Sequence, residues 1–361
     1  MISLLVTMML AQAPAQNVVL VTIDGLRPLE VFEGAQRAQM SGVEDEAGLV
    51  AKYWRESLAE RRRALMPFLW GQVAANGQLF SNVKVTNAQR CSYPGYNELL
   101  TGVADPRIEG NAHPANPNVT VFEWLSHQPG FEGRVQAFAT WDTFYRIFNV
   151  ERSGLDVRAG WTPPFAQDPV RTSAKDTLDE LYRTTTPLFG GNALDGITWA
   201  AQKESLKTNR PRLLFLGLGE TDEWMHAGRY DLALESVRRA DATIADLWNT
   251  LQSMPEYRGT TTLIITTDHG RGVGANDWRH HGADIAGSEE IWVAAIGPGV
   301  PALGERSDAL TQTQVASTIA QLLGHDWNAD APEAGRPLPL TRAASLALGR
   351  NATQRLAKNV E

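Results

Sequence analysis

Runs of consecutive apolar residues, rather than alternating ones, mark the strands of this sequence. The clearest runs cover residues 17–23 (NVVLVTI), 212–219 (RLLFLGLG) and 261–267 (TTLIITT). A strand that is apolar at every position is buried on both faces, which is typical of a parallel sheet covered by helices. Shorter runs predict further strands at 78–85, 134–140 and 289–296.

Helical patterns alternate with these strands along the chain. Apolar positions recur every three or four residues in the segments 96–100, 119–128, 173–185, 193–206, 229–254 and 311–323. Such alternation predicts an α/β protein with one doubly wound domain, in which helices cover both faces of a mostly parallel central sheet. The stretch 141–167 is aromatic and proline-rich without a period. We expect it to be a long irregular loop that covers a site and selects what enters it.

The two ends of the chain differ from the body. Residues 2–10 are apolar, and Ala11, Ala13 and Ala15 follow at small-x-small spacing. This resembles a secretory signal with cleavage after Ala13 or Ala15, although no positive residue precedes it. The other interpretation is an apolar N-terminus that feeds the first strand. We therefore expect a signal peptide at 1–15, a catalytic domain at 16–340, a charged surface helix at 341–361, and a periplasmic or secreted protein.

Composition and charge exclude several classes of protein. The net charge of −8 argues against a role in coating nucleic acid, so local positive charge must hold any phosphate or sulfate ester. The single cysteine, Cys91, excludes an internal disulfide and a cysteine-based zinc module. Beyond the N-terminus no apolar run reaches the ~20 residues that cross a membrane, so no membrane span is expected.

Carboxylates and imidazoles gather where the buried runs end. Asp24 follows one such run, Asp222 and His226 closely follow the run at 212–219, Asp268 and His269 follow the last run, and the loop after it carries His280 and His281. Asp24 directly follows the first run and Asp268 the last, and open α/β sheets bind ligands at the carboxyl ends of their strands. Asp222 and His226 are four residues apart, so one helical turn places both on the same side. Oxygen and imidazole ligands of this kind are those that divalent metals use.

A hydroxyl group precedes a helix in the segment CSYPGYNELLTG at 91–102. Ser92 lies at or near the helix N-terminus, where backbone N–H groups hold anions and help to activate a hydroxyl. An ordinary N-cap serine is the alternative interpretation. The following loop, 105–118, contains Asn111 and His113 as candidate pocket groups, and a turn-forming role explains an asparagine there equally well.

Together these motifs resemble the alkaline phosphatase superfamily, most closely its nucleotide pyrophosphatase/phosphodiesterase branch. The matching segments are VTIDGLR at 21–27, SYPGYNELLTG at 92–102, TDHG at 267–270 and HG at 281–282, with the pair Asp222 and His226 between them. They cover most of the chain in the order that the superfamily has. The resemblance implies an alkaline phosphatase-like fold and a hydrolase.

The resemblance also assigns roles to these residues. One divalent metal is expected at Asp24, Asp268 and His269, and a second at Asp222, His226 and His281. Ser92 is then the nucleophile, and Asn111 is our candidate for a substrate-binding amide. Ligands without sulfur suit zinc, with manganese as the alternative. The implied reaction is hydrolysis of a small-molecule phosphate monoester or diester through a phosphoserine intermediate.

The motifs also depart from those of the relatives. The nucleophile is serine where most phosphodiesterase relatives have threonine, and Gly95 and Tyr96 replace asparagine and histidine. Sulfatases of the superfamily use a C/S-x-P-x-R motif; here Ser92 and Pro94 match it, but the arginine is absent and Cys91 is one position off. A sulfatase, or an idle protein that binds metal and an anion, stays open as an alternative. Monoesters and diesters, and any oligomeric state, are equally compatible with the sequence.

Overall fold

One central sheet organises the molecule. The computed structural model describes residues 15–340; the predicted surface helix at 341–361 and the predicted signal peptide, apart from Ala15, lie outside the described residues. Within that range nine strands form the sheet: β1 (Asn17–Ile23), β2 (Gln78–Lys84), β3 (Val135–Ala139), β4 (Asp156–Ala159), β5 (Leu213–Leu218), β6 (Thr261–Thr266), β7 (Glu290–Ile296), β8 (Gly304–Arg306) and β9 (Leu310–Thr311). Their order is β4-β3-β5-β1-β6-β7-β2-β8, and β9 pairs with β2.

The sheet is mostly parallel, as the uninterrupted apolar runs predict. Strands β4, β3, β5, β1 and β6 run parallel to one another. Strand β7 is antiparallel to both β6 and β2, and β8 and β9 are parallel to β2. The three longest apolar runs of the sequence thus become three adjacent strands, β5, β1 and β6, in the middle of the sheet.

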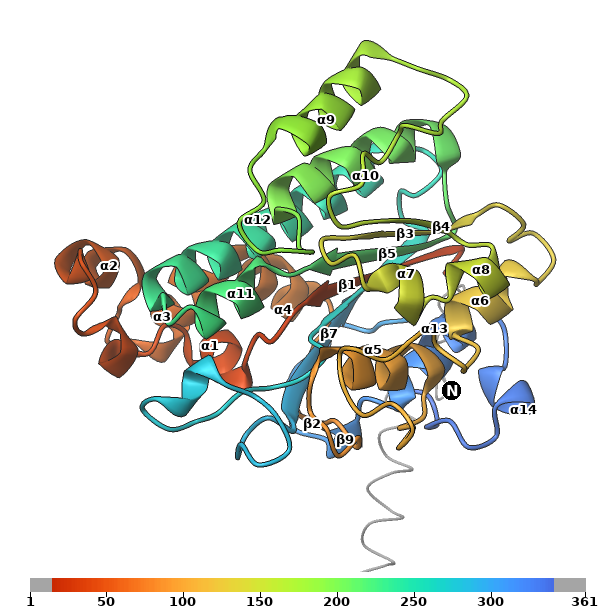
Figure 1. Cartoon of the computed structure of the whole chain (residues 1–361). Coiled ribbons are helices and arrows are strands. Elements are labelled where there is room, and N and C mark those ends of the chain that lie inside the picture. The colour runs from red at the N-terminus through yellow and green to blue at the C-terminus, as the bar shows by residue number, and fades with distance from the viewer. Residues whose placement is uncertain (1–14, 341–361) are drawn as a thin grey trace, which may run out of the picture.

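Helices cover both faces of this sheet (Figure 1). The described helices are α1 (Pro28–Glu33), η1 (Arg37–Met40), α2 (Glu46–Tyr53), α3 (Leu58–Leu65), η2 (Leu69–Val73), α4 (Ala74–Asn76), α5 (Ser92–Thr101), α6 (Val121–Ser126), α7 (Phe144–Ile147), α8 (Val150–Ser153), α9 (Ser173–Thr184), α10 (Asp195–Asn209), α11 (Glu220–His226), α12 (Tyr230–Ser253), η3 (Asp277–Arg279), α13 (Gln314–Leu322) and α14 (Trp327–Asp330). In Figure 1, α10 and α12 lie above the sheet and α5, α6 and α13 below it. No helix among residues 15–340 has the length and apolar character needed to span a membrane.

Two hydrophobic cores explain why the central strands are apolar at every position. Val18 and Leu20 of β1 lie in the core between the sheet and helices α5, α6 and α13. Val19 and Val21 lie in the core between the other face of the sheet and helices α10 and α12. Successive side chains of a strand point to opposite faces, so only a strand buried on both faces needs this pattern. The prediction of a doubly wound α/β domain is confirmed.

The stretch 141–167 is not the irregular loop that we expect from its sequence. It contains α7, α8 and the edge strand β4. Phe144 and Phe148 are buried, and their rings pack on Phe215 of β5 at centroid distances of 5.0 and 5.5 Å. Burial of these aromatic rings against the sheet stabilises helices that are too short to show a period in the sequence.

The helix that carries Ser92 also begins earlier than the expected residue 96. Helix α5 starts at Ser92 itself. Pro94 lies in its first turn, where the missing N–H of proline costs no hydrogen bond. The N-cap residue is Cys91, so the interpretation of Ser92 as an ordinary N-cap is wrong.

Candidate metal centre

Three adjacent parallel strands deliver five of the six candidate ligands to one edge of the sheet. Asp24 follows β1, Asp268 and His269 follow β6, and α11, which carries Asp222 and His226, follows β5. Parallel strands place their carboxyl ends at the same edge, so residues far apart in the sequence meet there. The sixth ligand, His281, comes from the loop between η3 and β7.

The first predicted ligand set forms a compact group. One ligand atom from each of Asp24, Asp268 and His269 lies within 4.8 Å of the others, and all three side chains are buried. His269 Nε2 is 3.6 Å from Asp24 Oδ1 and 3.4 Å from Asp268 Oδ2. The structure therefore brings together the three residues that the sequence suggests for one metal.

The second set is continuous with the first. Ligand atoms of Asp222, His281 and His269 lie within 4.8 Å of one another. His226 Nε2 is 3.3 Å from Asp222 Oδ2 and 3.0 Å from His281 Nε2. The rings of His269 and His281 are stacked, with centroids 3.8 Å apart. All six side chains form one cluster in which His269 borders both groups.

The chemistry of this cluster fits divalent cations. Asp24 Oδ1 and Asp268 Oδ2 are buried and have no hydrogen-bond partner among the described residues. Unpaired buried carboxylate oxygens are costly, and a cation would compensate them. His269 Nδ1 faces Gly270 O at 2.9 Å and His281 Nδ1 faces Arg90 O at 3.1 Å. These carbonyls favour N–H at Nδ1 and leave each Nε2 unprotonated, as a metal-binding imidazole requires.

The pKa shifts of the clustered side chains also favour a bound cation. Burial, reinforced by Asp268 and Asp222, raises the pKa of Asp24 well above its usual value. Burial and the Asp222 carboxylate raise the pKa of Asp268 to about 8. Burial lowers the pKa of His269 to about 4, so its imidazole is neutral at pH 7. The high pKa values of Asp24 and Asp268 indicate carboxylates without enough positive charge around them, which a bound cation would supply.

A buried arginine that the sequence analysis does not identify supports the second group. Arg271 Nη2 forms an ion pair with Asp222 Oδ1, and its Nη1 donates to Arg279 O at 2.7 Å. Arg271 thereby ties α11 to the loop that carries His281. Burial tends to raise the pKa of Asp222, but Arg271 and His226 hold it well below its usual value. A β-carbon on Gly25, at φ +60°, would lie 2.5 Å from Asp222 Oδ1, so only glycine fits beside this pair.

We predict that Arg271→Met destabilises the metal-free protein by about 3–5 kcal/mol, because it leaves the buried Asp222 carboxylate without its cation. Added zinc should reduce this loss, since a bound cation replaces the missing charge. Urea unfolding with and without zinc measures both effects. Arg279→Met is the matched control, because that side chain is exposed. Equal stability of Arg271→Met and Arg279→Met would contradict the prediction.

Ser92 lies directly beside the first group. Its Oγ is 3.3 Å from His269 Nε2, and the residue is 6% exposed. Helix α5 packs so closely on the end of β6 that a β-carbon on Gly95 would lie 2.4 Å from Asp268 O. This contact explains why glycine occupies position 95, and it fixes the first turn of α5 against the ligands.

Glu98, which lies further along α5, fixes the position of the segment that precedes Ser92. Its buried carboxylate accepts hydrogen bonds from the backbone N–H groups of Thr86 and Asn87, at 2.7 and 2.8 Å, and from the side chains of both residues. Burial raises the pKa of Glu98, and these hydrogen bonds partly offset the increase. The clamp joins α5 to the end of β2, and so positions the chain that enters Ser92.

We predict that Glu98→Ala lowers the free energy of unfolding by about 3–5 kcal/mol, because several buried donors lose their acceptor at once. Denaturant unfolding monitored by circular dichroism gives this value. The exposed Glu109→Ala provides the comparison and should change stability by less than about 0.5 kcal/mol. A Glu98→Ala protein as stable as the Glu109→Ala protein would show that the clamp is unimportant.

A cavity of about 240 Å³ opens on the cluster. Its lining residues are Asp24, Ser92, Asn111, Trp141, Asn192, Gly219, Asp222, Glu223, His226 and His281. Ser92 and the predicted amide residue Asn111 therefore face one space together with four of the candidate ligands. Asn111 Oδ1 accepts from Tyr93 N at 2.9 Å, and its Nδ2 has no hydrogen-bond partner among residues 15–340. This nitrogen is available to donate to a bound oxyanion.

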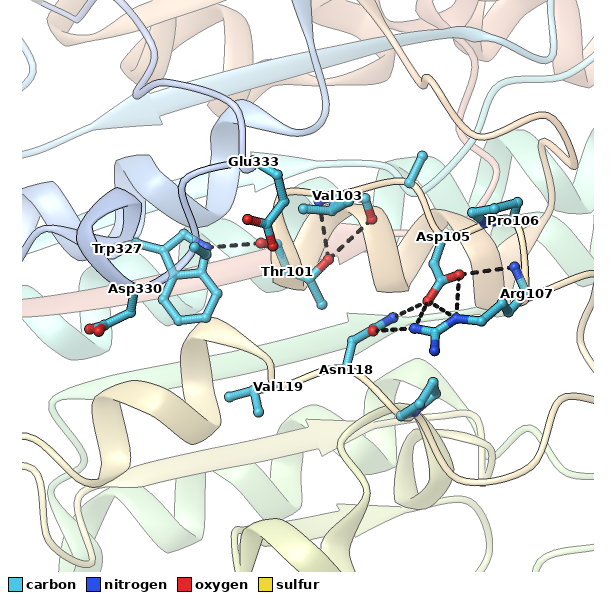
Figure 2. Close-up of a pocket in the computed structure, with 13 residues that line it drawn as sticks. Thr101, Val103, Asp105, Pro106, Arg107, Asn118, Val119, Trp327, Asp330 and Glu333 are labelled. Carbon is cyan, nitrogen blue, oxygen red and sulfur yellow. Dashed lines mark hydrogen bonds and ion pairs between the residues drawn. The ribbon is translucent and has the colours of Figure 1, made fainter.

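Most of the two predicted loops lies away from this cavity. Of the stretch 141–167 only Trp141 lines it, and of the loop 105–118 only Asn111. Figure 2 shows that Asp105, Arg107 and Asn118 instead line a separate cavity of about 470 Å³ beside Thr101, at the opposite end of α5 from Ser92. There the three side chains hydrogen-bond one another.

Sequence reasoning does not identify Asn192, Gly219 or Glu223 as lining residues. Glu223 follows the candidate ligand Asp222 directly, and this adjacency was a usable signal. Asn192 lies in the connection between α9 and α10, where no motif marks it.

Comparisons with solved structures support the fold described above. The chain is similar to a protein in the alkaline phosphatase superfamily from Vibrio parahaemolyticus (14% identity, TM-score 0.58, covering 92% of this chain and 72% of that one). It is also similar to the alkaline phosphatase PafA (11%, 0.59, 91% and 99%) and to the phosphonate monoester hydrolase of Agrobacterium radiobacter (12%, 0.52, 86% and 74%). At these identities the likeness establishes the fold. A search of curated proteins finds no match.

A match to a protein family gives a narrower assignment than the fold. Residues 101–315, more than half of the chain, match the family described as type I phosphodiesterase / nucleotide pyrophosphatase. The protein belongs to that family, within the alkaline phosphatase superfamily, as the motifs indicate. The matched range contains Asp222, His226, Asp268, His269 and His281, whereas Asp24 and Ser92 precede it.

Proposed function

We propose that this protein is a metal-dependent phosphodiesterase in which Ser92 is the nucleophile. One observation carries the proposal: Ser92 Oγ, 3.3 Å from His269 Nε2, shares a cavity with Asn111 and with the cluster of carboxylates and imidazoles. Membership of the phosphodiesterase family supports hydrolysis of a phosphate ester.

Each residue has a role in the proposed reaction. Asp24, Asp268 and His269 would hold one divalent cation, and Asp222, His226 and His281 a second. Such cations supply Lewis-acid stabilisation of the oxygens that gain negative charge. Zinc is our first choice because of the oxygen and nitrogen ligands, with manganese as the alternative. The Asn111 amide donates to a phosphoryl oxygen and orients the ester.

The covalent chemistry takes place in two steps. Ser92 Oγ bonds to phosphorus and its proton passes to water, while the bond from phosphorus to the leaving oxygen breaks and the departing alkoxide takes up a proton from water to become the alcohol. Water then attacks the phosphoserine, releases a phosphate monoester and returns a proton to Ser92. The overall reaction converts one diester and one water molecule into one alcohol and one monoester.

The charge of the cavity favours a diester over a monoester. No lysine or arginine lines it among the described residues, and Glu223 adds a carboxylate to the wall. Arg271 is held by Asp222 and does not line the cavity. A monoester dianion would therefore be held by the metal cations alone, whereas a diester carries one negative charge less.

The test compares three chromogenic esters with the zinc- or manganese-loaded protein. We expect kcat/KM for bis(4-nitrophenyl) phosphate to exceed that for 4-nitrophenyl phosphate by roughly 10-fold or more, in line with the cost of one uncompensated charge. Faster monoester turnover would overturn the diester assignment. Turnover of 4-nitrophenyl sulfate would instead indicate a sulfatase, and bound metal without any turnover would indicate an idle anion-binding protein.

A further inference from the structure

A wall of three side chains completes the cavity on the side of β3 and β5. We call Trp141, Asn192 and Glu223 the distal wall. Trp141 follows β3 and Glu223 belongs to α11, which follows β5; these two strands are parallel neighbours. Asn192 reaches the same edge because its backbone pairs with that of Trp141 in an isolated antiparallel bridge. All three residues line the cavity that contains Ser92.

Hydrogen bonds fix one oxygen of Glu223 and leave the other available. Asn192 Nδ2 donates to Glu223 Oε1 at 2.6 Å, and Thr140 Oγ1 donates to Asn192 Oδ1 at 3.3 Å. A β-carbon on Gly219 would lie 2.5 Å from Thr140 Oγ1 and 2.9 Å from Asn192 Oδ1, so a larger residue there would displace these two side chains. Among residues 15–340, Glu223 Oε2 has neither a hydrogen-bond nor an ion-pair partner. The distal wall therefore contributes a carboxylate whose second oxygen makes no direct hydrogen bond or ion pair with a protein cation among the described residues.

The position of the distal wall assigns it to the leaving group. In-line displacement places the departing oxygen opposite the attacking Ser92 Oγ. Asn111 lies close to Ser92, because its Oδ1 accepts from the backbone N–H of Tyr93, the next residue of α5. Glu223 lies on α11, next to Asp222 of the second ligand group. An alcohol that departs from Ser92 toward the second group reaches the distal wall.

We propose that the distal wall is a subsite for a positively charged ammonium group on the leaving alcohol. This inference rests on the proposed phosphodiesterase function. A carboxylate and an indole ring that line the same cavity can bind an ammonium group through charge and through the ring face. A leaving group with a second phosphate or a carboxylate would meet the Glu223 charge instead, and the lining contains no lysine or arginine to offset it.

Binding of the product alcohol tests the subsite without turnover. The probes are 3-(trimethylammonio)phenol and its uncharged isostere 3-tert-butylphenol, titrated calorimetrically into the zinc-loaded protein. We expect the cation to bind roughly 10-fold more tightly, and Glu223→Gln to remove most of this preference. Trp141→Leu, which keeps an apolar side chain, should reduce the preference as well. Glu220→Gln, on the same helix but outside the cavity lining, should retain it.

Turnover of two matched diesters provides the second readout. They are methyl 3-(trimethylammonio)phenyl phosphate and methyl 3-tert-butylphenyl phosphate. Their intrinsic reactivities differ, so the measured quantity is the ratio of their kcat/KM values in wild type divided by the same ratio in Glu223→Gln. We expect this quotient to be about 10 or more, expressed mainly in KM.

The outcomes separate the two proposals. Equal binding of the two phenols to wild type, or equal losses for both in Glu223→Gln, would overturn the cationic subsite even if both esters are hydrolysed. Selective binding of the cation without hydrolysis of either ester would retain the subsite and overturn the phosphodiesterase proposal.

Discussion

Ser92→Ala is expected to lower kcat for diester hydrolysis by a factor on the order of 10⁴, because no other group can replace an absent nucleophile. Within the described residues, Ser92 is the serine that lines the cavity. The substitution removes only Oγ from a helix whose position is fixed by Glu98 and by the close contact of Gly95. Metal content and thermal stability should therefore stay close to those of wild type.

Steady-state kinetics with bis(4-nitrophenyl) phosphate measure the loss, and mass spectrometry of a quenched reaction should find phosphate on Ser92 in wild type. The exposed Ser57→Ala is the matched control, since its hydroxyl makes no capping hydrogen bond. A Ser92→Ala enzyme with more than about a tenth of wild-type kcat would remove Ser92 from the mechanism.

Asp268→Asn is expected to lower kcat/KM by a factor on the order of 10³, because loss of a ligand forfeits several kcal/mol of transition-state stabilisation. Asp268 is fully buried, and its Oδ2 has no hydrogen-bond partner among the described residues. Metal analysis after dialysis should find less bound cation than in wild type. Wild-type metal content together with wild-type activity would exclude Asp268 as a ligand.

The same substitution has a pH signature in the metal-free protein. Burial and Asp222 raise the pKa of Asp268 to about 8, whereas an unfolded aspartate titrates near 4. Between these values the folded state retains a proton that the unfolded state has lost, so stability falls as pH rises from about 4 to about 8. Melting temperatures of chelator-treated wild type should decline across this window, and those of Asp268→Asn should decline less. An identical decline in both would show that Asp268 is not responsible.

Local signals in the sequence predict part of the ligand cluster, and the resemblance to the alkaline phosphatase superfamily supplies the complete set, including the choice of His281 in its loop. Asp24 and Asp268 directly follow short, β-branched apolar runs that end at turn residues, a pattern that favours buried strands. Once these strands are parallel neighbours, their carboxyl ends must converge. Ser92 stands at a proline-containing helix start that is visible in the sequence, but its role as nucleophile is implied by the resemblance and stays a prediction.

The other parts of the site depend on tertiary contacts that leave no local pattern. Asn192 reaches the cavity through a single backbone bridge to Trp141. Arg271 reads as an ordinary loop arginine until α11 places Asp222 against it. The helices α7 and α8 exist because the sheet buries their aromatic residues, and a four-residue helix has too few positions to show a period.

The order of the strands affects when the sheet can form during translation. Strand β1 is synthesised first among the strands, yet both of its partners, β5 and β6, emerge from the ribosome much later. Both hydrogen-bonding edges of β1 therefore stay unpaired during most of translation. Pairings between segments so distant in the sequence also form slowly. Cation capture, which needs all three strands, would then be a late event in maturation, and a nascent chain stalled before β6 should fail to retain zinc.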